Sequence, residues 1–350
     1  MENVSVVTLV YYKNYEALEK KCSIIINEMS GKDEIIFVLN RENSEKAMAI
    51  AMENKKLLNK YNIDEELTLI AKKYGALLVI PSKNGLATAR NEGIENAKNE
   101  IIIISDEDTI PEKDYIKNIK NCFDKTNSDF IFGRDLKINK NTGYFAWWRN
   151  EYEMAFSKRN QIYNLKQITL ENFANCAGRN IAFKKSEFNK IGKYDDKFDN
   201  FIGEDSDLQL RFVKNNRKVC FCPEMKTKHL HRMTFVNLLK KFWINGKSSA
   251  NWLFYVQSKN SSEKKIKNYV PFSELIFFII LLSTLFLSNI FYPMAVFIFY
   301  GVYKFFKKLR SKTINIKFFA LSLCLLPIES IVSLVAFIFE FSRRKLISNK

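Results

Sequence analysis

The apolar positions in the first 135 residues fall into two patterns that alternate along the chain. Short continuous apolar runs are typical of buried strands, and apolar residues three or four apart are typical of helices packed on one side. The runs predict five strands, at Val4–Val10, Glu34–Leu39, Ala76–Ile80, Ile101–Ser105 and Asp129–Gly133. The helical pattern predicts segments at Glu16–Glu28, Ser44–Lys60, Asn62–Lys73 and Leu86–Ala97, with a capping box opening the third. This alternation predicts right-handed crossovers and a parallel α/β sheet.

Carboxylates follow the most apolar of these strands. Asp106, Glu107 and Asp108 come one residue after four consecutive isoleucines. Ligands bind at the carboxyl edge of an α/β sheet, where such residues lie. Because side chains alternate along an extended chain, Asp106 and Asp108 are predicted to lie on the same side, where they can hold one divalent cation.

Two long apolar stretches dominate the last 80 residues. Leu275 to Tyr303 contains no charged residue, and as one helix it would extend for about 43 Å, beyond the ~30 Å of a hydrocarbon core. Polar residues and a proline interrupt it, so a hairpin of two short spans and one long kinked helix both fit. The second stretch, Phe318–Phe339, is also long enough to span. Glu329 near its centre is typical of a re-entrant or interfacial segment.

Basic residues leave the topology open. Residues 307–310 follow the first stretch and residues 343–345 follow the second, and both clusters are expected on the cytoplasmic side. A hairpin keeps the first cluster there, but a further full span would export the second. Upstream, Phe235, Leu238 and Phe242 begin an apolar stripe flanked by lysines. The stripe predicts an amphipathic helix that either rests on the membrane surface or packs on the α/β core.

The net charge and the cysteines indicate the cellular compartment of the protein. The formal net charge of the 350 residues is +17, of which the last 80 residues carry +7. Without a zinc-finger spacing, an RNA-binding motif or a basic heptad segment, this excess indicates an anionic membrane surface and no nucleic acid. Six cysteines without metal-ligand spacing fit a reducing compartment, and the first residues lack a signal-peptide pattern. We therefore expect an integral membrane protein whose main domain faces the cytoplasm.

Three motifs occur in a defined order. They are Asn-Gly-Leu-Ala-Thr-Ala-Arg-Asn at Asn84–Asn91, Asp-Glu-Asp at Asp106–Asp108, and Gly-Glu-Asp-Ser-Asp at Gly203–Asp207. Together they resemble the family-2 glycosyltransferases, over about residues 4–246. The resemblance implies the GT-A fold, in which a Rossmann-like half binds a nucleotide and a mixed half binds the acceptor.

The resemblance also implies a metal and a donor site. Asp106, Asp108 and His229 are expected to hold Mg²⁺ or Mn²⁺, which neutralises the departing diphosphate. His229 and His231 match the His-x-His-Arg segment of the family, and we favour His229 as the ligand. The residues expected to contact the nucleotide-sugar donor are Asn84, Arg90, Asn91 and Asp106.

The third motif is expected to activate the acceptor. Asp205 matches the general base of a single inverting displacement, and Glu204 is expected to orient an acceptor hydroxyl. Asp207 is expected to cap the helix that follows. The acceptor-side candidates are Asn180, Trp147 and Trp148. Core packing is the better interpretation of the two tryptophans.

Two departures from the family pattern bear on specificity. Leu39 or Asn40 stands where the family places an aspartate that holds the nucleobase, so the identity of the base stays open. No Gln-x-x-Arg-Trp segment follows the histidines. Because processive synthases of the family carry that segment, we expect transfer of one sugar or a few.

The sequence thus predicts a catalytic domain at 1–232, a juxtamembrane segment at 233–270, membrane-anchoring helices at 271–341 and a basic tail at 342–350. The expected function is metal-dependent, inverting transfer of a sugar to a lipid-linked saccharide or another membrane-associated acceptor. One alternative is a nucleotidyl or phosphoryl transferase, for which the chain lacks a phosphate-binding P-loop. Another is an inactive membrane scaffold, which the two acidic clusters and His229 argue against.

Overall fold

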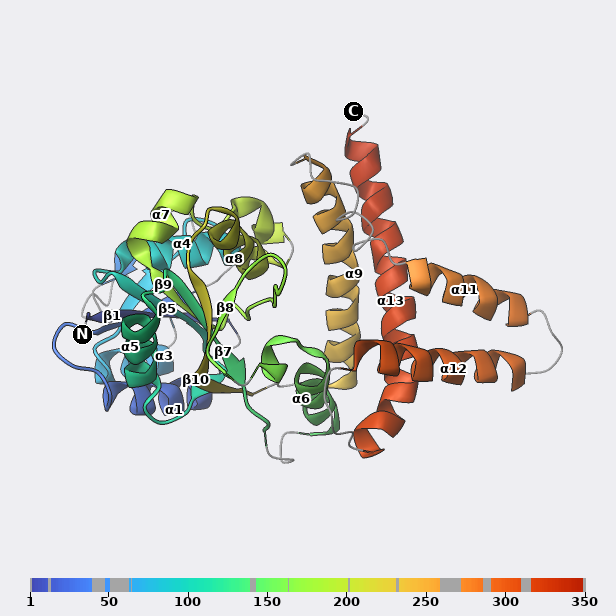
Figure 1. The fold of residues 1–350 in the computed structure, drawn as a ribbon, viewed down its shortest axis with the longest axis horizontal. Coiled ribbons are helices and arrows are strands. Elements are labelled where there is room, and N and C mark those ends of the chain that lie inside the picture. Colours follow the sequence, from blue (N-terminus) through green and yellow to red (C-terminus); the bar gives the residue numbers. More distant parts are fainter. Residues whose placement is uncertain are drawn as a thin grey trace. The chain divides into compact units, whose positions relative to one another are not determined.

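The computed structural model describes residues 2–11, 14–39, 48–50, 63, 65–138, 143–162, 164–200, 202–230, 233–258, 272–285, 291–309 and 316–348. Contacts within the chain define two compact units. The first unit is Met1–Asn139 with Ser157–His231, and the second is Lys140–Phe156 with Arg232–Lys350. Figure 1 shows the elements of both, and each unit is described by itself below.

The first unit is built on one mixed sheet. Its strand order is β3-β4-β2-β1-β5-β9-β7-β10-β6, with β8 also paired to β10. The bounds are β1 Val4–Val10, β2 Glu34–Leu39, β3 Met48–Ile50, β4 Leu77–Ile80, β5 Ile101–Asp106, β6 Thr109–Pro111, β7 Phe130–Asp135, β8 Lys166–Ile168, β9 Asn180–Lys184 and β10 Val219–His229. Strands β4, β2, β1 and β5 are parallel, as the sequence predicted, and β9 runs antiparallel between β5 and β7.

Helices cover both faces of this sheet. On one face, α1 (Tyr15–Ile26), α3 (Glu65–Lys73) and α5 (Tyr115–Thr126) bury their apolar sides in a single cluster with the sheet. On the other face, α4 (Leu86–Asn96) packs so closely that a Cβ at Gly93 would lie 2.5 Å from Val38 Cγ2. The helices α7 (Lys185–Ile191) and α8 (Glu204–Lys214) complete the unit, with the short helices η2 (Arg159–Gln161) and η3 (Asp196–Asn200).

One predicted helix is wrong in the part that the structure describes. Residues 48–50, expected within a helix at Ser44–Lys60, form β3 and pair antiparallel with β4. The apolar triplet Met-Ala-Ile finds hydrogen-bond partners at the sheet edge, and such pairing overrides local helix propensity. The rest of that segment lies outside the described residues, as does Asn62 of the expected capping box.

The second unit is helical. It contains α6 (Tyr144–Phe156), α9 (Phe235–Ser258), α11 (Phe272–Leu285), α12 (Phe291–Lys308) and α13 (Ile316–Ser348). Trp147 and Trp148, named above as acceptor-side candidates, lie in an apolar cluster with α9, α12 and α13, and Trp148 Nε1 donates a hydrogen bond of 2.9 Å to Ser322 Oγ. Helices α9 and α13 run side by side (Figure 1), and a Cβ at Gly246 would lie 2.1 Å from the carbonyl oxygen of Ser333.

Within the described residues, one helix is long and apolar enough to cross a membrane, and it is Ile316–Leu346 of α13. Length and composition alone define this candidate span, and half of its apolar window is buried within the protein. The helix α11 is apolar but shorter.

Candidate functional site

The first acidic cluster lies at the carboxyl end of β5, in the middle of the sheet. Asp106 ends the strand, and its carboxylate oxygen Oδ1 is buried without a hydrogen-bond donor among the described residues. Lys21, a fully buried lysine on α1, donates to the backbone carbonyl of Asp106. Burial lowers the pKa of Lys21 to about 8 against the opposing charges of the three acids. Glu107 is almost completely buried, whereas the side chains of Asp106 and Asp108 are partly exposed.

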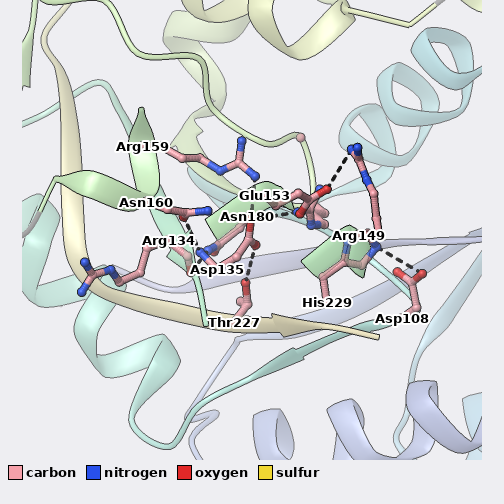
Figure 2. Close-up of polar contacts among 12 residues, drawn as sticks. Asp108, Arg134, Asp135, Arg149, Glu153, Arg159, Asn160, Asn180, Thr227 and His229 are labelled. Carbon is pink, nitrogen blue, oxygen red and sulfur yellow. Dashed lines mark hydrogen bonds and ion pairs between the residues drawn. The ribbon is translucent and has the colours of Figure 1, made fainter. Parts of the chain in front are cut away.

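Asp108 and His229 meet across two strands. Antiparallel pairing of β6 with β10 sets Thr109 opposite His229, and the amide of Leu230 donates to the carbonyl of Asp108. His229 Nε2 lies 3.3 Å from Asp108 Oδ2 (Figure 2). Burial alone would raise the pKa of Asp108, but His229, with Arg179 and Lys21 nearby, lowers it to about 2. The carboxylate is therefore ionised at neutral pH. His231 lies outside the described residues.

Arg90 connects the first acidic cluster to the second. Its side chain is 3% exposed and forms an ion pair with Glu204, and Nη2 lies 3.7 Å from Asp106 Oδ1. The guanidinium also lies over the ring of Tyr194, at 5.6 Å. A Cβ at Gly178 would lie 2.8 Å from Arg90 Nη2, so glycine leaves the space that the guanidinium fills. This pairing holds the end of β5 and the start of α8 together.

Asp205 occupies the first turn of α8 with both carboxylate oxygens engaged. The amide of Gly178 donates to Oδ2 at 2.7 Å, and the amide of Ser206 donates to Oδ1 at 2.7 Å. Gln209, one turn further on, bonds the loop before β9 through Cys176 and Ala174. Asp207, expected to cap the helix, instead pairs with Arg211. These two amides fix the orientation of the Asp205 carboxylate.

The amino end of α4 is occupied by a carboxylate of the chain itself. Asp199 of η3 accepts a hydrogen bond from the amide of Thr88 at 2.9 Å and one from its hydroxyl at 2.6 Å. Asn84 is exposed, whereas Asn91 exchanges two hydrogen bonds with the backbone of Tyr194. Both contacts attach the loop before Asp205 to α4.

A second buried cluster, which sequence reasoning missed, surrounds Asp135 at the end of β7. Arg159 and Arg179 both donate to Asp135 Oδ2, at 2.6 and 2.8 Å, and Thr227 lies 3.5 Å from Oδ1 (Figure 2). An aspartate within a few residues of an apolar strand run is the signal that could have found it, as it found Asp106. Asn180 ties the neighbouring strands together, because it accepts from Tyr115 and donates to carbonyls of Arg134 and Met225.

The atoms around Asp108 are of the types that bind a hard divalent cation. Carboxylate oxygens and an imidazole nitrogen suit Mn²⁺ or Mg²⁺, and Asp106 Oδ1 is buried without the hydrogen bond that such an atom normally accepts. No three acidic, histidine or cysteine side chains among the described residues already converge as a ligand set. Asp106, Asp108 and His229 are the residues that would hold the ion, with substrate or water oxygens completing its shell.

Comparison with known proteins decides the family. Residues 24–243 match the family model described as "Glycosyltransferase like family 2". The chain belongs to this family. No curated protein is significantly similar to it in sequence. The family predicted from the three motifs is thereby confirmed, and the protein is a glycosyltransferase.

Two solved structures are similar to this chain. One is the mannosyltransferase PcManGT from Pyrobaculum calidifontis, solved in complex with GDP-Man and Mn²⁺. It is 13% identical with a TM-score of 0.58, over 97% of this chain and 88% of that one. Another is GalNAc-T7, solved with UDP, GalNAc and Mn²⁺, which is 15% identical with a TM-score of 0.47, over 70% of this chain and 47% of that one. The predicted GT-A fold is confirmed.

Proposed function

We propose that this glycosyltransferase moves a sugar from a nucleotide-sugar donor to a membrane-associated acceptor in a single inverting step that depends on Mg²⁺ or Mn²⁺. The observation that carries the proposal is the arrangement around Arg90. One buried arginine pairs with Glu204, next to Asp205, and approaches Asp106, next to the Asp108–His229 pair. A metal-type donor set and a base candidate are thus held on one framework, as transfer to an activated hydroxyl requires.

The metal site follows from three side chains. Asp106, Asp108 and His229 would bind the cation, which supplies neutralising charge to the diphosphate as it leaves. PcManGT and GalNAc-T7 were both solved with Mn²⁺, which is consistent with this proposal for the present chain. Lys21 donates a hydrogen bond to the backbone carbonyl of Asp106, and this bond helps to fix the orientation of the Asp106 and Asp108 carboxylates.

Asp205 is the proposed general base. The amides of Gly178 and Ser206 hold its carboxylate in place, and it can take the proton of the acceptor hydroxyl as that hydroxyl attacks. We assign Glu204 to positioning rather than to the acceptor, because its carboxylate is buried against Arg90. Because Arg90 is buried, we propose that it holds the two acidic clusters together and does not contact the donor directly.

The remaining candidates act around this centre. Asn84, exposed at the start of α4, stays a proposed donor contact, and Asn91 holds the loop before Asp205. Asn180 supports the strands under the acceptor side. We propose a lipid-linked saccharide or other membrane-associated acceptor because the second unit carries the apolar helices α11, α12 and α13. We also propose that the catalytic domain predicted at residues 1–232 faces the cytoplasm.

The test is sugar transfer by the full chain in detergent or lipid. A panel of nucleotide sugars is supplied with Mn²⁺ or Mg²⁺ and a membrane lipid extract, and both the glycosylated product and the free nucleoside diphosphate are measured. We expect one donor to give both products in equal amounts, only with the metal, and an inverted anomeric configuration by NMR. Release of sugar 1-phosphate would instead indicate nucleotidyl transfer, and release of nucleoside monophosphate would indicate transfer of the sugar phosphate. Binding of no donor would indicate an inactive scaffold.

A further inference from the structure

The helices α11 and α12 form an antiparallel hairpin. Phe277 stacks on Tyr300 with ring centroids 3.8 Å apart, and Glu274 pairs with Lys304 at 3.0 Å, so the start of α11 lies beside the end of α12. No charged residue occurs from Leu275 to Tyr303. All charge of the hairpin is therefore at its open end, which we call the base.

The outer surface of the hairpin is apolar. Ten large apolar side chains on the two helices are between 40% and 74% exposed. They are Leu275, Ile276, Ile279, Ile280 and Leu282 of α11 and Met294, Ile298, Phe299, Tyr303 and Phe306 of α12. An exposed apolar surface of this extent, in a chain that already buries a large core, marks a surface that contacts a partner or a membrane.

The base of the hairpin is joined to the middle of α13 by charged groups. Glu329 of α13 lies 3.0 Å from Lys308 Nζ and 4.0 Å from Lys304 Nζ, and Tyr152 of α6 bonds both Glu329 and Lys308. Lys304 also donates to Ser330. Side-chain contacts of α12 with α13 include those of Lys304, Phe305 and Lys308 in its last turns, and the hairpin projects away from α13 (Figure 1).

This arrangement separates two ways of entering a membrane. If α13 crossed the bilayer, Glu329, near the middle of the helix, would carry Lys304, Lys308 and Glu274 with it into the hydrocarbon centre. Charged side chains are costly there. If the hairpin enters instead, the same four charges lie at its base, at the level of the lipid headgroups, and only uncharged residues meet the hydrocarbon.

We propose that the α11–α12 hairpin enters an anionic bilayer and returns to the same side, while α13, the helix best suited to span by length, lies along the surface. The inference rests on the membrane attachment proposed above and states which helices provide it. Trp243 and Ile244 of α9 and Val335 of α13 are exposed and apolar, which suits helices at an interface.

The basic clusters support this topology. Lys307 and Lys308 are at the base of the hairpin, and Arg343 and Arg344 are near the end of α13. A chain that enters and returns, with α13 on the surface, keeps both clusters on one side, where they face anionic lipid headgroups. Three full spans would place them on opposite sides.

The first experiment measures sidedness. The full chain carries an epitope tag at each end, and sealed membrane vesicles with the catalytic unit outside are treated with protease. We expect both tags to be digested without detergent. Digestion of the amino-terminal tag alone, with the carboxyl-terminal tag protected until detergent is added, would show that α13 crosses and would overturn the proposal.

The second experiment compares Ile298→Glu on α12 with Val335→Glu on α13. The two side chains are 47% and 43% exposed, and both lie near the middle of their helices. A charge in the hydrocarbon should reduce the ratio of membrane-bound to free protein by about 100-fold for Ile298→Glu, and we expect less than about fivefold for Val335→Glu. Equal release by both changes would place α13 in the hydrocarbon and contradict the proposal.

Two controls separate the possible failures. Thermal unfolding in detergent confirms that each variant is folded before its partition is measured. Neither experiment uses sugar transfer, so an inactive but membrane-bound chain would refute the proposed reaction and leave the topology standing. A wild-type chain that stays soluble without detergent would refute the membrane attachment and this proposal together.

Discussion

Asp205 is the residue whose substitution best separates chemistry from binding. Asp205→Asn keeps the shape of the side chain but removes its ability to take a proton. We expect transfer to fall about 10²–10⁴-fold, because general-base catalysis contributes that much, with donor affinity changed less than about twofold. Nucleotide-sugar binding is measured beside transfer, and Asp196→Asn, whose side chain is 67% exposed, is the control. Transfer at the wild-type rate would show that Asp205 only stabilises its helix.

The metal assignment can be tested without any substrate. Asp108→Ala removes the carboxylate whose Oδ2 lies 3.3 Å from His229 Nε2. We expect Mn²⁺ binding to be lost. His229→Ala should weaken Mn²⁺ affinity by at least about tenfold, and His231→Ala should change it much less. Calorimetric titration of Mn²⁺ into the metal-free protein measures all three. Equal and small effects of the two histidine changes would assign the pair a structural role.

Residues that the sequence grouped together lie close in the structure, but some of their pairings were not predicted. Asp108 and His229 are 121 positions apart, yet the family motifs brought both into one predicted metal site, and the structure places them together. The pairing of Arg90 with Glu204 and the contacts of Asp199 with Thr88 were not predicted. Both join segments more than 100 residues apart, and local patterns of apolar and polar residues carry no information on such pairs.

At the scale of elements, the contact of η3 with the start of α4 sets the loop that leads to Asp205. Asp199→Ala removes the acceptor of two hydrogen bonds from Thr88. We expect local stability to fall by about 1–2 kcal/mol, since loss of a helix cap costs about that much. Hydrogen exchange at residues 86–90 measures it, because their protection reports local opening.

The matched change for this prediction is Asp196→Ala, on the same short helix. Its side chain is exposed and pairs only with Lys83 among the described residues, so exchange at residues 86–90 should be unaltered. If the two variants exchange alike, Asp199 does not hold the start of α4.

The parallel strands β1, β2, β4 and β5 were predicted closely, whereas β9, which lies between β5 and β7, and the edge strand β3 were not. The bounds of β1 and β2 agree with the predicted strands at every residue, because fully buried strands are continuous apolar runs. The edge strand β3 was missed, since three residues form it and only their pairing with β4 defines it. Strand pairing of this kind depends on tertiary position, which a local pattern does not contain.

At the scale of the whole molecule, the two units have separate apolar cores. The main core of the first unit draws its residues from Val4 to Met225 and includes none from the second. Removing residues 272–350 should therefore leave the first unit folded and able to bind its nucleotide sugar. Membrane attachment should be lost.

The expected side effect of this deletion is exposure of α6 and α9. Trp148 and Phe242 lose their partners Phe305 and Phe318, so the shortened protein should need detergent or should aggregate. Near-ultraviolet circular dichroism and donor binding measure the outcome. A shortened chain that is unfolded even in detergent would show that the first unit depends on the second.

The discontinuity of the second unit has a consequence during synthesis. Helix α6 is made early, but Trp148 reaches its hydrogen-bond partner Ser322 only 174 residues later. At about 5–20 residues per second, a ribosome needs on the order of 10–35 s to synthesise the segment between Trp148 and Ser322. Throughout that interval the apolar side of α6 lacks its partners in α13, and it is a ready binding site for a chaperone or the membrane-insertion machinery. A stalled or prematurely terminated chain would display that side permanently, which makes α6 the segment by which a cell can recognise an unfinished copy.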